Sequence, residues 1–195
     1  MSLKVSRKRA GRERMRRLPS PSDRAKEVIK EILRQAGDLG KTNIFKAFWL
    51  AHLYYSKNAR GYLTDWPIVR MPNGPGIDQG DSLLLQLIHS GDVVRTYEAV
   101  GPFTEINCRL AKQSKDKKSP LPQAAIKAIK LAVSDVKGRR ATQVSKWSHE
   151  FSRSWNNTRD GVELDIYTDL IPDDVYEERR QQLLNLKKAY DKLVR

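Results

Sequence analysis

The residue types that most often carry catalysis are few in this chain and far apart. The three histidines are His52, His89 and His149, and the one cysteine is Cys108. His52 and His89 stand in strongly apolar segments, where a histidine is more often a hydrogen-bonded core residue than a ligand. Cys108 has no activating neighbour in sequence, which favours a small buried side chain over a nucleophile. Because no Cys or His pair has the spacing of metal ligands, we predict no metal site.

The glycine-rich segment "NGPGIDQG" does not match a known phosphate-binding pattern. It lacks the Lys-Ser/Thr pair of a phosphate loop and the glycine spacing of a dinucleotide-binding turn. Asp78 and Asp81 follow it, but nothing marks them as an acid–base pair, and Asp81 is equally suited to cap a helix. We therefore predict that the protein is not an enzyme, with no catalytic residue and no cofactor.

Positive charge is concentrated at the start of the chain. The formal net charge is +14, and residues 1–18 hold eight basic side chains against one acid. Such a segment predicts weak, sequence-independent binding of nucleic acid through phosphate contacts, and a solvated extension is the equal alternative. The candidate contacts are Arg7, Lys8, Arg9, Arg12, Arg14, Arg16 and Arg17.

Cysteine usage and hydropathy bear on the compartment. A single cysteine excludes an intrachain disulfide, which fits a reducing environment. The longest apolar run, near residues 44–53, is interrupted by Lys46 and His52 and is far shorter than the ~20 residues that span a bilayer. We expect a cytoplasmic protein that does not interact with membranes.

Hydrophobic periodicity predicts a mainly α fold: a compact bundle of five to six helices with one small β-hairpin. The helix that begins near residue 43 is apolar nearly all round, which places it at the centre of the domain. Residues 57–80 read as a long loop stiffened by prolines. The predicted helices span 22–36, 43–56, 81–90, 122–136, a segment that Thr142 caps, and 173–194, and the predicted hairpin spans 93–111.

Composition and pattern divide the chain into three parts. Residues 1–20 form a basic N-terminal extension, 21–172 a helical domain, and 173–195 a C-terminal helix packed on that domain. Tyr176, Leu183 and Tyr190 repeat every seven residues in the last part, as do Leu186 and Leu193. Three heptads are too few to define a coiled coil, so a homodimer through this helix is the alternative to packing on the domain.

Residues 122–153 also fit a second function. They read as two helices joined by a short turn that contains glycine, as in a helix-turn-helix, and the hairpin could serve as a wing. The second of these helices offers few side chains suited to reading bases. A DNA-binding, winged-helix-like transcriptional regulator that uses this pair and the basic tail is therefore the alternative function.

Four segments, taken in order, resemble the Panacea domain, also called the SocA-like antitoxin domain. They are "KTNIFKAFWLAHLYY", "TDWPIVRMPNGPGI", "SLLLQLI" and "ATQVSKWSHEFSRSW". The family has a Lys-containing helix rich in aromatics, then an aromatic residue shortly before Gly-Pro, and finally a Ser/Thr-His ahead of Trp. The matching residues are Lys41, Lys46, Trp66, Gly74, Pro75, Ser148, His149 and Trp155, over about residues 41–156.

The resemblance implies a helical, protein-binding domain of bacterial or phage type. Members of the family neutralise a toxin encoded beside them, by direct contact or by delivery to proteolysis. The expected partner is thus a protein, the product of an adjacent gene.

The surface where that partner binds is predicted from residue types. We place it on the 62–80 loop and the fifth predicted helix, because Trp66 in a rigid loop would suit an interface anchor. Gly74, Pro75, His149 and Trp155 are the other motif residues, and a purely scaffolding role for them is the alternative.

Overall fold

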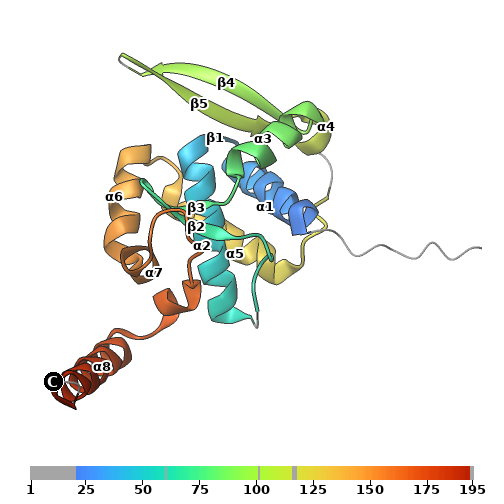
Figure 1. Cartoon of the computed structure of the whole chain (residues 1–195). Helices are drawn as coiled ribbons and strands as arrows, with labels where there is room; N and C mark the ends of the chain where they lie inside the picture. Colours follow the sequence, from blue (N-terminus) through green and yellow to red (C-terminus); the bar gives the residue numbers. More distant parts are fainter. Residues whose placement is uncertain (1–20, 60, 101, 116–117, 194–195) are drawn as a thin grey trace, which may run out of the picture.

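The computed structural model describes residues 21–59, 61–100, 102–115 and 118–193, so the basic tail, with its candidate nucleic-acid contacts, lies outside the described residues. The fold is mainly helical, as predicted, but with more helices and more strand than expected (Figure 1). Eight α-helices are described: α1 (Pro21–Ala36), α2 (Lys41–Asn58), α3 (Gly80–His89), α4 (Lys112–Lys115), α5 (Gln123–Val136), α6 (Ala141–Phe151), α7 (Arg153–Asn157) and α8 (Asp173–Leu193). The two extra helices, α4 and α7, are four and five residues long.

Helix α2 forms the centre of the domain, as its all-round apolar sequence predicts. Phe48, Trp49 and Leu50 are consecutive and all fully buried, which requires neighbours on every side of the helix. Helices α1 and α5 pack along it, and α6 and the 3₁₀ helix η1 (Ile166–Leu170) close the remaining sides (Figure 1). The side chains on the first turns of α2 are therefore held in place by a rigid core.

The predicted hairpin is present and gains a third strand. Strands β4 (Val93–Val100) and β5 (Phe103–Leu110) pair antiparallel, and β1 (Asp38–Gly40) pairs with the other edge of β5. Cys108 and Leu110 are buried in the core while Arg109 between them is exposed, so side chains alternate along this part of β5. The short β1 segment connects α1 to α2 and ties the hairpin to the helical core.

The predicted 57–80 loop contains a second hairpin, which corrects the expectation of a single one. Strands β2 (Ile68–Met71) and β3 (Gly74–Ile77) pair antiparallel around the two-residue turn Pro72-Asn73. Pro75 and the flanking glycines made the sequence look irregular, because proline and glycine are rare inside strands. Here β3 has only one partner strand, so the missing N–H of Pro75 costs no ladder bond.

Two helix starts differ from the residues predicted to cap them. Helix α6 begins at Ala141 behind the N-cap residue Arg140, so Thr142 lies inside its first turn. Helix α3 begins behind Gln79, whose φ is 47°, and Asp81 lies within the helix. The Asp81 carboxylate forms an ion pair with Lys41 Nζ at 3.0 Å, a long-range contact that local capping rules do not anticipate.

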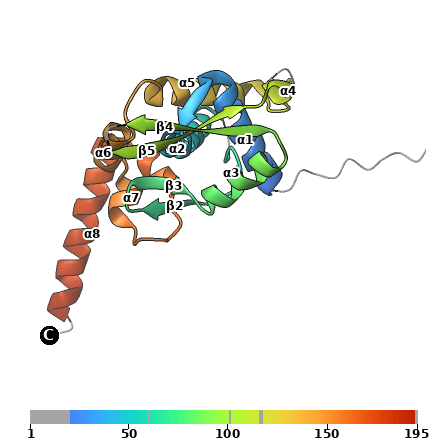
Figure 2. The same ribbon diagram turned by 90° about the horizontal axis from the view of Figure 1, so that it is seen from above.

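The C-terminal helix does not pack along the domain, contrary to the expectation for residues 173–195. Helix α8 projects from the body, and none of its residues is buried (Figures 1 and 2). Only its start is tied down: Arg153 forms an ion pair with Asp173, and Tyr176 Oη accepts a hydrogen bond from Asn157 at 2.8 Å. No helix among the described residues is long and apolar enough to cross a membrane.

Candidate functional site

The motif residues from three separate segments meet at one point of the domain. Lys46 comes from α2, Gly74-Pro75 from β3, Ser148-His149 from α6 and Trp155 from α7. We call the side chains of Lys46, Ser148, His149 and Trp155, with the backbone of Gly74-Pro75, the Lys46 cluster. Its assembly was not derivable from spacing, because the contributing segments are separated by whole helices.

Lys46 is the buried basic residue of this cluster. Its side chain is 2% exposed, and Nζ donates a hydrogen bond to the Pro75 carbonyl oxygen at 2.7 Å. Burial lowers the pKa of the Lys46 amine to about 7, because a charged ammonium loses its hydration there. Near neutral pH the amine therefore exists in both protonation states.

Gly74 is required by both conformation and space. Its φ is +93°, in the region that disfavours residues with a β-carbon. A β-carbon at this position would clash with Ser148 Oγ and would lie 2.7 Å from Lys46 Nζ. The glycine thus allows the β2–β3 hairpin to approach α2 and α6 directly, which is the packing that holds the cluster together.

His149 and Trp155 lock α6 and α7 against the hairpin. Their rings are stacked with centroids 4.0 Å apart and planes 5° apart, and Trp155 Nε1 donates to the Met71 carbonyl oxygen at 2.8 Å. Burial lowers the pKa of His149, and the nearby Lys46 charge lowers it further. The imidazole therefore packs face to face on the indole and joins α6 to α7.

Arg70 is a member of this region that the sequence did not reveal. Its guanidinium lies 4.3 Å from the centre of the Trp155 ring, and its Nε donates to the Trp155 carbonyl oxygen at 2.9 Å. The same side chain forms an ion pair with Asp160 at 2.6 Å. Nothing local in "IVRM" signals this role, because its partners lie on α7 and in the segment after it.

Trp66, the predicted interface anchor, is held by the protein itself. It is half-buried against the hydrophobic core, and its Nε1 donates to the Asp78 carbonyl oxygen at 2.7 Å. Tyr62 is more exposed, with its ring 5.0 Å from that of Tyr167. Trp66 and Tyr62 line a hollow of about 210 Å³. Because its indole N–H is already hydrogen-bonded within the protein, Trp66 is no longer the first candidate for the partner-binding surface.

The remaining candidate residues for chemistry have ordinary surroundings. His52 is buried between the carbonyl oxygens of Phe48 and Thr64, and burial lowers its pKa to about 4. Cys108 is buried, as predicted, and burial raises its pKa. His89 is exposed at the end of α3, which corrects its predicted place in the core. Within the described residues, His, Cys, Asp and Glu form no group of three or more that could hold a metal ion.

A polar network after α6 was also missed by sequence reasoning. Asp169 accepts hydrogen bonds from the Ser152 and Ser154 hydroxyl groups at 3.0 and 2.7 Å and from the Ser154 backbone N–H at 2.8 Å. Burial raises the pKa of Asp169, while these hydrogen bonds oppose the rise. The network fixes α7 to η1 and so positions Trp155. The "SRSW" segment carried no signal for it beyond the capping tendency of serine.

The helix pair proposed for DNA reading is present as α5 and α6. The exposed side chains of α6 are a mixed set with one base and one acid: Thr142, Gln143, Lys146, Glu150 and Phe151. A groove-reading helix usually presents several donors for bases and phosphates. The regulator alternative therefore stays a prediction without an observation in its favour.

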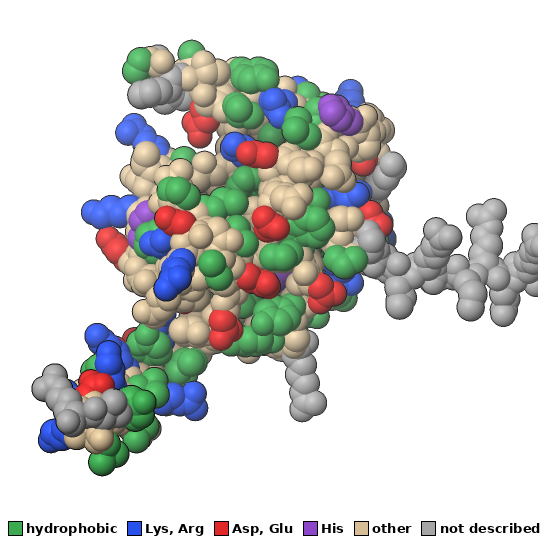
Figure 3. All heavy atoms as spheres, in the orientation of Figure 1, with side chains coloured by type: hydrophobic (Ala, Val, Ile, Leu, Met, Phe, Trp, Pro, Cys, Tyr) green, Lys and Arg blue, Asp and Glu red, His purple; other side chains and the backbone are tan. Residues whose placement is uncertain are grey.

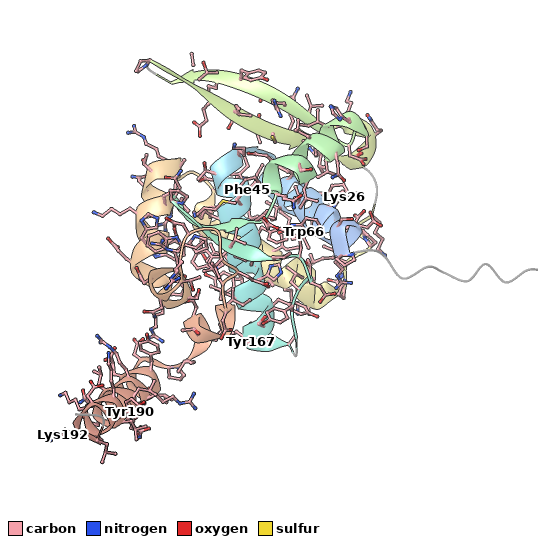
Figure 4. The ribbon with its side chains drawn as sticks, in the orientation of Figure 1. Lys26, Phe45, Trp66, Tyr167, Tyr190 and Lys192 are labelled. Carbon is pink, nitrogen blue, oxygen red and sulfur yellow. The ribbon has the colours of Figure 1, made fainter. Side chains whose placement is uncertain are left out.

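Helix α8 presents the most exposed apolar side chains of the described chain. Leu183, Leu186 and Leu193 are 67%, 66% and 85% exposed, and Tyr190 is 65% exposed. Hydrophobic side chains gather on the outer half of this helix (Figure 3), where Tyr190 is labelled in Figure 4. The seven-residue repeat found in the sequence is thus a real helical stripe, but it faces solvent.

Comparison of the chain with protein-family models, curated proteins and solved structures gives no match. The resemblance to the Panacea domain therefore stays a prediction. Of the residues that carry it, Lys46, Pro75, His149 and Trp155 belong to the Lys46 cluster, whereas Trp66 is hydrogen-bonded to Asp78.

Proposed function

We propose that this protein is a non-catalytic protein-binding module that captures its partner with helix α8. The observation that carries this proposal is the apolar stripe of α8, which the domain leaves uncovered. Contiguous exposed apolar surface on a folded protein commonly marks an interaction site. The helical body then serves as the rigid base from which α8 projects.

The energetics favour a helix-in-groove mode of binding. Fully burying a leucine side chain contributes roughly 1.5–3 kcal/mol, so three leucines and a tyrosine supply enough for a stable complex. Leu183, Leu186 and Tyr190 have the i, i+3 and i+7 spacing of the anchors that such grooves read, and Leu193 follows Leu186 by seven residues. The partner should therefore present an elongated apolar groove.

Charge on α8 sets the direction in which it would lie. Asp173 and Asp174 stand in its first turn, while Lys192 stands in its last. A groove with basic residues at one end and acidic residues at the other would complement both ends. This charge pattern follows the helix dipole, so it stabilises the free helix as well.

The resemblance to antitoxins supplies the identity proposed for the partner. We infer a toxin encoded by an adjacent gene, neutralised by direct binding or by delivery to proteolysis. The Lys46 cluster supports this assignment because it joins the motif residues into one rigid unit. In this proposal the cluster builds the scaffold, and α8 makes the contact.

Co-expression with the products of neighbouring genes tests the proposal. A growth-inhibiting neighbour should be neutralised by the wild-type protein and should co-purify with it. Leu186→Asp should weaken that complex by about 2 kcal/mol or more, roughly thirtyfold in Kd, as for a central anchor. Asn185→Asp is the matched control, since it adds the same charge at a neighbouring exposed position of α8.

Two results would count against this function. Equal affinity of the Leu186→Asp and Asn185→Asp variants would remove α8 from the interface. A wild-type dimer in light scattering that Leu186→Asp converts to a monomer would show that α8 pairs with a second copy of itself instead.

A further inference from the structure

Lys46 has a feature that scaffolding does not require. A carbonyl oxygen can be satisfied by a neutral donor, yet Pro75 receives its hydrogen bond from a lysine. Of the three N–H donors of the ammonium, only this one has an acceptor among the described residues. Placing a charged group at 2% exposure without a counter-ion is unfavourable for folding. Such a cost is commonly retained at functional sites.

The other charges around Lys46 are paired among themselves. Lys41 forms an ion pair with Asp81 at 3.0 Å, and Arg70 forms one with Asp160 at 2.6 Å. His149, the remaining titratable group of the cluster, adds no negative charge. In the described part of the chain, Lys46 has no carboxylate within ion-pair distance, so its positive charge is uncompensated.

Lys46 also lines an open hollow. The hollow has a volume of about 230 Å³ and lies between the first turns of α2, the 71–76 segment of the β2–β3 hairpin and Asp81. Thr42, one turn before Lys46 on α2, contributes to the same wall. The first turn of α2 has no acidic residue, and Gly40 supplies no side-chain cap. Asp81 in the wall is paired with Lys41, so the unpaired charge of the lining is that of Lys46.

We propose that this hollow binds a carboxylate group, with Lys46 Nζ as its ion-pair partner. One ammonium with free donors matches one carboxylate in charge and in hydrogen bonding. A volume of about 230 Å³ fits a small organic acid or the carboxyl end of a peptide. The proposed carboxylate site does not depend on α8. The site can therefore be wrong while the proposed function holds, and the proposed function can be wrong while the site holds.

Binding should depend on pH through Lys46. The ammonium form binds the carboxylate, and the pKa of the free site is about 7. Below this value the affinity is constant until the carboxylate itself takes up a proton. Above it the affinity falls by about tenfold per pH unit, because Lys46 must first take up a proton. A carboxylate held by backbone N–H groups alone would show no such dependence.

Nuclear magnetic resonance on the isotope-labelled full chain at pH 6 provides the test. The probe is sodium acetate, compared with sodium chloride at equal ionic strength. Acetate should give saturable shifts at the Lys46 side chain and the Gly74 amide, and the affinity should drop at least tenfold at pH 8.5. Lys46→Met should abolish the shifts, while Lys146→Met, at an exposed lysine of α6, should retain them.

The source of the carboxylate is distinguished by a second pair of probes. A tripeptide with a free C-terminus and its C-terminal amide are titrated in the same way. Saturable binding of acetate and of the free-acid peptide, but not of the amide, assigns the site to chain ends. Binding of acetate alone assigns it to small acids. If acetate and chloride act alike on Lys46 of the wild-type protein, the proposal is wrong whether or not the variant folds.

Discussion

Substitution of Gly74 by alanine tests the packing on which the Lys46 cluster rests. Two costs act at this position. The backbone φ of +93° is strained for alanine, which costs roughly 1–2 kcal/mol. The new methyl group would also press on Ser148 Oγ and lie 2.7 Å from Lys46 Nζ. Both neighbours are buried, and overpacking of this kind costs about 1–3 kcal/mol more.

Gly138→Ala separates the two costs. Gly138 joins α5 to α6 with a φ of +77°, but nothing lies within 4 Å of the added methyl group. It therefore reports backbone strain alone. The difference between the two variants should be about 1–3 kcal/mol, with Gly74→Ala the less stable.

Thermal unfolding followed by circular dichroism measures both variants. For a domain of this size, 1 kcal/mol corresponds to roughly 2–4 °C in Tm, so Gly74→Ala should melt roughly 2–12 °C below Gly138→Ala. A companion variant, Gly74→Ala with Ser148→Gly, should recover part of the loss by removing the hydroxyl that the methyl group meets. Equal melting temperatures for the two alanine variants would refute the close approach of the hairpin to α6.

Three further predictions follow from the buried polar groups and the half-buried indole. Because Lys46 has a pKa of about 7 in the folded protein and near 10.5 when unfolded, the unfolded state binds more protons between these values, and stability should rise with pH there. Urea unfolding should be measured from pH 7 to 10. Over this range the free energy of unfolding of the wild type should rise relative to that of Lys46→Met by at most about 1.4 kcal/mol per pH unit. A constant difference between the two would contradict the buried amine. The pKa of His52 is about 4 in the folded protein and 6.5 when unfolded, so stability should fall as the pH drops from 6.5 to 4. In acid titrations His52→Gln should flatten that fall, and an equally steep fall in the variant would contradict the burial of His52. Trp66→Ala should lower the free energy of unfolding by about 2 kcal/mol. Trp66→Phe keeps most of the packing but loses the hydrogen bond to Asp78, so it should lower that free energy by about 1 kcal/mol. An unchanged Tm for Trp66→Ala would instead support the predicted role of Trp66 as an interface anchor.

Local features of the fold were predictable because their causes are local. Hydrophobic periodicity placed α1, α2, α3, α5 and α8 within a few residues of their observed bounds, since a helix is made of contacts three and four residues apart. The β4–β5 hairpin was found for the same reason, because its strands are neighbours in the sequence. The central position of α2 also followed, as a helix apolar on every side must be surrounded.

Elements that depend on distant partners were missed. Strand β1 exists because Leu39 pairs with Cys108, and three residues have no strand signal of their own. The β2–β3 hairpin was hidden by Pro75 and its glycines, although the Pro72-Asn73 pair between β-branched and glycine-containing segments offered a turn signal. Helix α7 and its serine contacts depend on Asp169, which lies beyond the segment that local rules consider.

For the candidate sites, the sequence determined which residues were available, and the tertiary structure decided what surrounds them. A lysine on an apolar helix, a Gly-Pro pair and a Ser-His pair are visible in the chain, but they surround Gly74 only because α2, β3 and α6 pack together. The heptad stripe of α8 was equally visible, yet the same spacing fits a helix packed on its domain and one that faces solvent. Periodicity reports which side of a helix is apolar; only the positions of the neighbouring elements decide whether that side is covered.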